Sequence, residues 1–119
     1  MSFQRSLNIA KSWDGKHLPA SEQARLRLVG DSQQLSVEFN APFRGDAPPP
    51  LPLGSTWALW EYEVLELFLV GASGTYLELE FGPHGHYLAL LLERPREIVS
   101  KHLPLHYRAT CADQRWYGK

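Results

Sequence analysis

The chain has 119 residues, which is the size of one domain and is enough to bury a single hydrophobic core. Its 12 lysines and arginines nearly balance 13 acids, so the net charge of −1 provides no basic face for nucleic acid or an anionic membrane. No stretch approaches the roughly 20 apolar residues of a membrane-spanning helix, and the amino terminus has no signal-peptide pattern. The lone Cys111 cannot form an internal disulfide, which favours a reducing compartment. We therefore expect a cytoplasmic protein without nucleic-acid or membrane partners.

Alternating apolar and polar residues predict strands in the first third of the chain. The alternation is regular over 25–28 and again over 35–39, and the turn residues Gly30-Asp31-Ser32 lie between these segments. Ser21 lacks the acid or glutamine that a helix capping box places three positions later, so we expect strand rather than helix there.

The segment 41–58 is predicted to be a long proline-rich loop. Its five prolines exclude a regular strand or helix. Loops of this length in a compact domain are usually functional or disordered. Because Leu51, Leu53, Trp57 and Leu59 lie in it or beside it, we expect the loop to pack onto the domain.

The remainder of the chain reads as an antiparallel meander. Strands are expected over 60–70, 75–82, 86–93, 98–102 and 105–111, with turns at Gly71-Ala72-Ser73-Gly74 and Pro83-His84-Gly85. Pro-His-Gly suits a three-residue hairpin loop in which glycine takes the left-handed conformation. Seven or so short strands predict an all-β fold, namely a jelly-roll-like antiparallel β-sandwich that forms one domain over 1–119.

The register of the first meander hairpin decides where its acids lie. A two-residue or four-residue turn within 71–74 places Glu66 opposite Leu79. A shift of one residue places Glu66 opposite Glu78, which is a destabilising pair of like charges. We therefore favour the first register, in which Glu66 is the single acid on an apolar core face. A buried carboxylate needs partners, so we expect Glu66 to be a structural acid held by hydrogen bonds.

The opposite face of the meander is expected to combine acids with leucines. Glu78 and Glu80 share this face with Leu88, Leu90 and Leu92. An apolar sheet face must be covered, and the proline loop, a second chain or a ligand could cover it.

Several motifs together resemble an uncharacterised protein family found in bacteria and animals. They are Ala41-Pro42-Phe43, 59–64 with Glu66, 76–80 with the Pro83-His84-Gly85 turn, Leu103-Pro104-Leu105, and Trp116 with Gly118. That family resembles, in turn, the β-sandwich of family-nine carbohydrate-binding modules and of DOMON-type domains. The resemblance implies a binding role rather than catalysis. In the family the sequence continues past the last motif, which implies that this chain is shortened at its carboxyl terminus.

Two tryptophans and three polar residues are the candidate ligand contacts. Trp57 and Trp60 flank the end of the proline loop, where exposed indoles could stack on a sugar ring and buried indoles would anchor the loop. Glu78, Glu80 and His84 are expected to supply polar contacts.

No metal or cofactor is expected. Glu78 and Glu80 could bind a hard cation, but no calcium-binding loop accompanies them. His84 and His86 share a strand face without the motifs of a zinc site. The only methionine is Met1, so the Met–His haem ligation of some DOMON-type domains has no donor.

The favoured hypothesis is a non-catalytic domain that binds a carbohydrate or a similar small polar ligand. The first alternative is a protein-interaction or homodimerising sandwich that uses the leucine-rich sheet face. The second is a sugar-active enzyme with paired glutamates, although no cleft is evident and no nucleophile, phosphate-loop or dinucleotide motif occurs.

Overall fold

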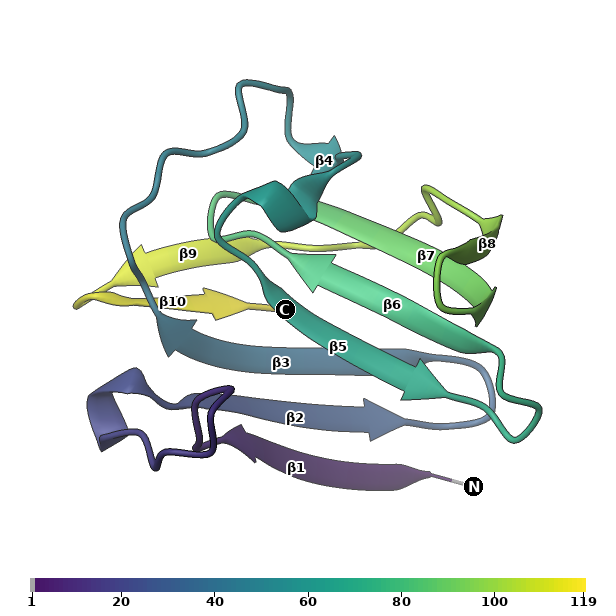
Figure 1. Cartoon of the computed structure of the whole chain (residues 1–119), viewed down its shortest axis with the longest axis horizontal. Helices are drawn as coiled ribbons and strands as arrows, with labels where there is room; N and C mark the ends of the chain where they lie inside the picture. The colour runs from purple at the N-terminus through teal and green to yellow at the C-terminus, as the bar shows by residue number, and fades with distance from the viewer. Residues whose placement is uncertain (1) are drawn as a thin grey trace. The chain divides into compact units, whose positions relative to one another are not determined.

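The computed structural model describes residues 2–119, whose regular secondary structure consists almost entirely of strands (Figure 1). These strands form two five-stranded sheets in which antiparallel pairing dominates. The predicted all-β class is therefore confirmed, and two such sheets are consistent with a β-sandwich. The chain divides into two compact units. The first unit comprises the chain up to Arg44 together with Ala109–Lys119, and the second unit is Gly45–Arg108.

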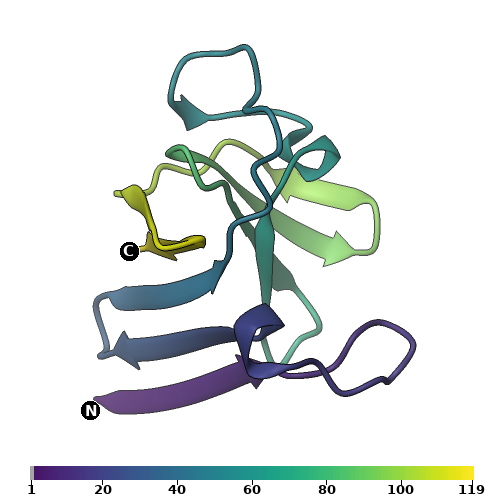
Figure 2. The same ribbon diagram turned by 90° about the vertical axis from the view of Figure 1, so that its left-hand side faces the viewer.

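The first unit is built on an antiparallel sheet with strand order β1-β2-β3-β10-β9. Its elements are β1 (Phe3–Ile9), the short 3-10 helix η1 (Ala20–Glu22), β2 (Ala24–Gly30), β3 (Leu35–Pro42), β9 (Ala109–Ala112) and β10 (Arg115–Gly118). Figure 2 shows β2 between β1 and β3, with η1 leading into β2. Because β10 pairs with β3, residues from both ends of the sequence share one sheet.

Alternation along β2 gives this sheet one apolar face. Ala24, Leu26 and Leu28 are buried, and the residues between them are exposed, because successive strand residues point to opposite faces. Phe39 of β3 and Trp116 of β10 are buried as well. Their rings meet edge to face with centroids 5.0 Å apart. The strands predicted over 25–28 and 35–39 are thus confirmed.

Three details of the first unit differ from the predictions. Strand β1 was not predicted, although its apolar residues alternate; all of its residues are exposed, as suits a strand at a sheet edge. The segment at Ser21, where a strand was expected, is the single turn η1, and the side chain of the next residue, Gln23, donates a hydrogen bond to the Leu18 carbonyl. The strand predicted over 105–111 begins only at Ala109.

The second unit is built on a sheet with strand order β4-β7-β6-β5, and β8 also pairs with β7. Its elements are β4 (Gly54–Ser55), the 3-10 helix η2 (Leu59–Glu61), β5 (Leu65–Val70), β6 (Tyr76–Phe81), β7 (His86–Arg94) and β8 (Glu97–Ser100). The predicted meander is present as β5, β6 and β7. Its first strand starts at Leu65 instead of residue 60, because η2 occupies the start of the predicted strand.

The predicted register of the β5–β6 hairpin is wrong. Val70 pairs with Tyr76, and Glu66 therefore lies opposite Glu80 instead of Leu79. The Gly71 amide donates to the Thr75 carbonyl at 2.9 Å, which leaves a loop of three residues. A loop with an odd number of residues reverses which side chains share a face relative to a loop of two or four.

Both hairpins of the meander use the same kind of loop. In the second hairpin the Gly82 amide donates to the His86 carbonyl at 2.8 Å, so the predicted three-residue loop is confirmed. The last loop residue is glycine in each case, with φ of +89° at Gly74 and +109° at Gly85. Positive φ values are strained for residues with a side chain, so glycine is the favoured residue at both positions.

Both faces of the second sheet are apolar, as predicted, but the partition of residues between them differs. Leu65, Leu67, Leu79 and Phe81 share one face. The other face carries Glu66, Glu78, Glu80, Leu88, Leu90 and Leu92. Leu59 of η2 is fully buried in one cluster with the three leucines of β7. The chain itself therefore covers the leucines for which a second chain or a ligand was considered.

The proline-rich loop is attached to β7 by hydrogen bonds. Nε2 of the buried His86 lies 3.0 Å from the Leu51 carbonyl oxygen, and the Thr56 amide donates to the Tyr87 carbonyl at 2.8 Å. The apolar side chains of the loop contribute less than predicted, because Leu51 and Leu53 are exposed. Figure 2 shows the loop arching outward before it returns to β4.

Candidate functional site

Trp57 and Trp60 form an exposed aromatic pair at the start of η2. Trp60 belongs to the helix, whereas Trp57 is separated from it by the N-cap residue Ala58, which has a left-handed conformation with φ of 61°. Leu59, the first residue of the helix, points into the leucine cluster. The two indoles are 43% and 44% exposed, and they meet edge to face with centroids 5.2 Å apart. Their placement, which the sequence left open, is therefore at the surface.

Three polar residues lie on the Trp57 side of this aromatic pair. The Lys101 ammonium lies 5.2 Å from the centroid of the Trp57 ring, a distance at which a cation is attracted to the indole. The His102 ring lies 6.1 Å from the Trp57 ring, and its Nδ1 is 2.6 Å from Oγ of Ser55. We refer to Trp57, Trp60, Ser55, Lys101 and His102 as the tryptophan platform.

The sequence did not predict the polar members of the platform. Ser55 and His102 are 47 positions apart, and they meet because β4 and β8 both pair with β7. His102 has φ of 56°, which is uncommon for a residue with a side chain and orients the segment after β8. No local motif signals such a contact, since it depends on long-range strand pairing.

Glu80, not Glu66, is the buried acid of the sheet. Glu66 is exposed, whereas Glu80 is completely buried. Burial and, to a lesser extent, the adjacent Glu78 and Glu66 side chains raise the pKa of Glu80 to about 9. Neither carboxyl oxygen of Glu80 has a hydrogen-bond partner within residues 2–119. Glu80 is therefore protonated at neutral pH, and its complete burial places it away from the surface on which a ligand contact was expected.

The pKa of Glu66 is raised as well, first by the partial loss of hydration around its carboxyl group and then by the negative charge of Glu78. The three carboxyl groups thus form an acidic cluster on one sheet face. Within the described range, no group of three or more His, Cys, Asp or Glu side chains is arranged to hold a metal ion.

Glu78 and His84 do not join the tryptophans. Glu78 is half-buried on the acidic face of β6. His84 lies in the second hairpin loop and lines a pocket of about 10 Å³, which has room for about one water molecule. Within residues 2–119, the two indoles make ring contacts with each other and with His102, and a cation–π contact with Lys101. The predicted set of five contacts is therefore not assembled.

A larger hollow, of about 510 Å³, lies on the sheet of the first unit. None of the residues that line it was predicted as a site. The only sequence signal was the exposed pair Arg25 and Arg27 in the alternating pattern of β2.

No helix among residues 2–119 has the length and apolar character needed to cross a membrane.

The chain is similar to a group of animal proteins. It is 37% identical over 119 residues to UPF0462 protein C4orf33 of Homo sapiens, 38% identical over 117 residues to the homolog of Rattus norvegicus, and 35% identical over 115 residues to that of Danio rerio. These matches cover 93% of this chain but only 57% of each relative. No protein-family model and no solved structure matches the chain. The predicted resemblance to an animal family is thus supported, whereas these matches do not support the carbohydrate-binding-module and DOMON resemblances.

Proposed function

We propose that the chain is a non-catalytic binding domain that stacks a saccharide ring on the tryptophan platform. The observation that carries this proposal is the pair of half-exposed indoles in edge-to-face contact. Aromatic rings bury much area at little entropic cost, and an apolar sugar face packs on an indole as other rings do. Trp60 has no ring contact within residues 2–119 other than Trp57, which leaves it as the principal stacking surface.

The polar residues of the platform would hold the hydroxyl groups of the sugar. Nδ1 of His102 is engaged by Ser55, so Nε2 is the ring nitrogen that faces a ligand. The Lys101 ammonium adds a donor beside Trp57. A site with one apolar surface and a few fixed polar groups is typical of small-ligand recognition. In this proposal Lys101 and His102 take the role that was expected of Glu78, Glu80 and His84.

The two alternatives have less support. Leu88, Leu90 and Leu92 are buried beneath Leu59, so a homodimer could not use them without displacing η2. A hydrolase that uses paired glutamates needs both acids within reach of the substrate, and Glu80 is fully buried. A cytoplasmic location, which a single cysteine favours, also stays a prediction.

The proposal is tested with Trp60→Ala and a panel of neutral saccharides. We expect the wild type to bind at least one glycan, and the variant to bind it about tenfold more weakly, which corresponds to about 1.4 kcal/mol. Isothermal titration calorimetry gives the affinities. Because Trp60 is half-exposed, its loss should leave the melting temperature nearly unchanged. The matched control is Trp13→Ala, which removes a tryptophan that is 99% exposed in the other unit.

Two outcomes would contradict saccharide stacking. One is that no glycan binds the wild type, in which case analytical ultracentrifugation tests the homodimer instead. The other is that Trp60→Ala and Trp13→Ala weaken binding to the same extent, which would place the ligand elsewhere.

A further inference from the structure

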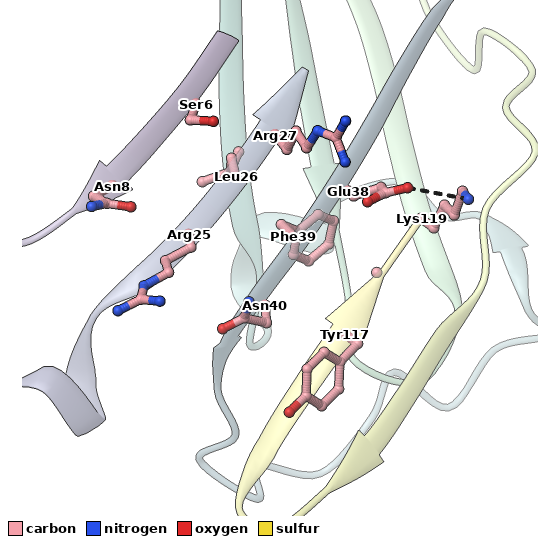
Figure 3. A pocket seen from close by; sticks show the side chains of 11 residues that line it. Ser6, Asn8, Arg25, Leu26, Arg27, Glu38, Phe39, Asn40, Tyr117 and Lys119 are labelled. Carbon is pink, nitrogen blue, oxygen red and sulfur yellow. Dashed lines mark ion pairs between the residues drawn. The ribbon is translucent and has the colours of Figure 1, made fainter. Parts of the chain in front are cut away.

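The hollow on the first unit lies over a continuous row of polar side chains. Asn8 pairs with Arg25, Arg25 with Asn40, and Asn40 with Tyr117, so one residue from each of four neighbouring strands stands at the same register position. Directly paired residues of antiparallel strands point to the same face. Figure 3 shows the four side chains following one another across β1, β2, β3 and β10. We call Asn8, Arg25, Asn40 and Tyr117 the polar row.

Arg115 fixes the orientation of the Asn40 amide. Its Nε and one terminal nitrogen donate to Asn40 Oδ1 at 3.1 and 2.7 Å. The same guanidinium donates to the carbonyls of Ser21 and Gln23, which holds it in place. Because Oδ1 of Asn40 accepts from Arg115, the Nδ2 group is the end of the amide that is left to donate toward a ligand.

The other members of the row are free to bind. Arg25, Asn8 and Tyr117 make no side-chain hydrogen bond, ion pair or ring contact within the part of the chain that the structure describes. The guanidinium of Arg25 therefore keeps all of its donors for a ligand, and Arg25 lies between Asn8 and Asn40 on the neighbouring strands. Its neighbour Arg27, in contrast, donates to Oε1 of Gln4 at 3.2 Å.

The charges around the row leave an excess of positive charge at Arg25. Lys119 is paired with Glu38 at 3.2 Å, so these two charges offset each other. Figure 3 shows this pair near Arg27, beside the row. No acid belongs to the row itself, so nothing within it competes with an anion for Arg25.

We infer that the hollow above the polar row is a second binding site, for a small molecule that carries an oxyanion. The oxyanion, a carboxylate or a phosphate, binds the guanidinium of Arg25, whose planar donors suit two-point contact with either group. Asn8, Asn40 and Tyr117 donate to the polar body of the same molecule. The volume of about 510 Å³ falls within the range of small-molecule sites. This inference is independent of the tryptophan platform and of the neutral saccharide proposed there.

The test compares three ligands that share one ring and differ in charge. They are glucose 6-phosphate, glucuronate and glucose, titrated into the full chain at low ionic strength and followed through the side-chain amide signals of Asn8 and Asn40 in ¹⁵N NMR spectra. We expect one or both anions to shift these signals and glucose to leave them unchanged. The stronger anion identifies whether the site prefers phosphate or carboxylate.

Two arginine variants form a matched pair for this test. Arg25→Gln and Arg27→Gln each remove one positive charge from the exposed face of β2. Because a guanidinium–oxyanion contact is strong, we expect Arg25→Gln to weaken anion binding at least tenfold and Arg27→Gln to weaken it less than threefold. Anion binding should persist in Trp60→Ala, which separates failure here from failure at the tryptophan platform.

The inference is overturned if neither anion shifts the two amide signals. It is also overturned if both arginine variants weaken binding equally, since this result would indicate attraction by diffuse surface charge. Both arginines are exposed, so their replacement should not prevent folding.

Discussion

Glu80 shows how one side chain can make stability depend on pH. Its complete burial without a hydrogen-bond partner disfavours the ionised form, so its pKa rises from the ordinary value of 4.5 to about 9. Between these values the folded protein holds a proton that the unfolded chain releases. The contribution of Glu80 to stability is therefore fully present below pH 4.5, is lost progressively as pH rises, and is gone above about pH 9.

We predict that Glu80→Gln stabilises the protein above neutral pH. In the wild type, the unfolding free energy decreases with rising pH by at most about 1.4 kcal/mol per pH unit. The neutral amide of the variant cannot ionise, so this decrease does not occur. Urea unfolding from pH 5 to pH 8.5 measures the difference, which should grow with pH. The control is Glu93→Gln on the exposed part of β7. A Glu80→Gln variant that is less stable at pH 8 would mean that the buried acid is ionised and paired.

The β5–β6 hairpin shows that the length of a short loop decides the chemistry of a whole sheet face. Its three-residue loop places Glu66, Glu78 and Glu80 together, whereas a loop of two or four residues would have separated Glu66 from the other two. Pro83-His84-Gly85 was recognisable as a three-residue loop from its sequence. Ala72-Ser73-Gly74 has the same glycine position, and this was the available signal for the correct register.

We predict that the loop tolerates Gly74→Asn better than Gly74→Val. Position 74 has φ of +89°, a conformation that a β-branched residue adopts only under strain and asparagine adopts more readily. Valine should lower the unfolding free energy by about 1–3 kcal/mol, and asparagine by clearly less. Urea denaturation followed by circular dichroism gives both values. Space is not the cause, since nothing lies within 4 Å of a Cβ at this position. Equal losses for the two variants would contradict the backbone explanation.

At the scale of the whole molecule, the first unit is assembled from two distant parts of the chain. Strand β10 lies beside β3, and Trp116 is 2% exposed against Phe39. Gly118 leaves the space that the Phe39 ring fills. The sheet of the first unit therefore depends on residues 109–119, although the second unit separates them from β3 in the sequence.

We predict that Trp116→Ala destabilises the protein by about 3–5 kcal/mol, the usual cost of removing a buried large aromatic side chain. The matched control is Trp13→Ala, because Trp13 belongs to the same unit and is 99% exposed. Thermal unfolding followed by circular dichroism avoids reliance on tryptophan fluorescence. A small effect of Trp116→Ala, comparable with that of Trp13→Ala, would show that β10 is not part of the stable sheet.

The sequence by itself determined the features that depend on neighbouring residues. Alternation over 25–28 and 35–39 predicted strands, and glycine predicted the two hairpin turns of the meander, because strand periodicity and turn conformation are local properties. The apolar character of both faces of the second sheet was also visible. In contrast, β1 was missed, because Arg5 interrupts the alternating series of Phe3, Leu7 and Ile9 and makes the strand pattern weak.

Only the tertiary structure decided which residues form sites. The register made Glu80 the buried acid, the pairing around β7 brought Ser55 and His102 to Trp57, and four paired strands placed Arg25 in the polar row. Each of these arrangements depends on the pairing of strands that hold residues distant in the sequence. A strand pattern gives the face on which a residue lies but not its partner on the next strand, because loop lengths and long-range pairing set the register.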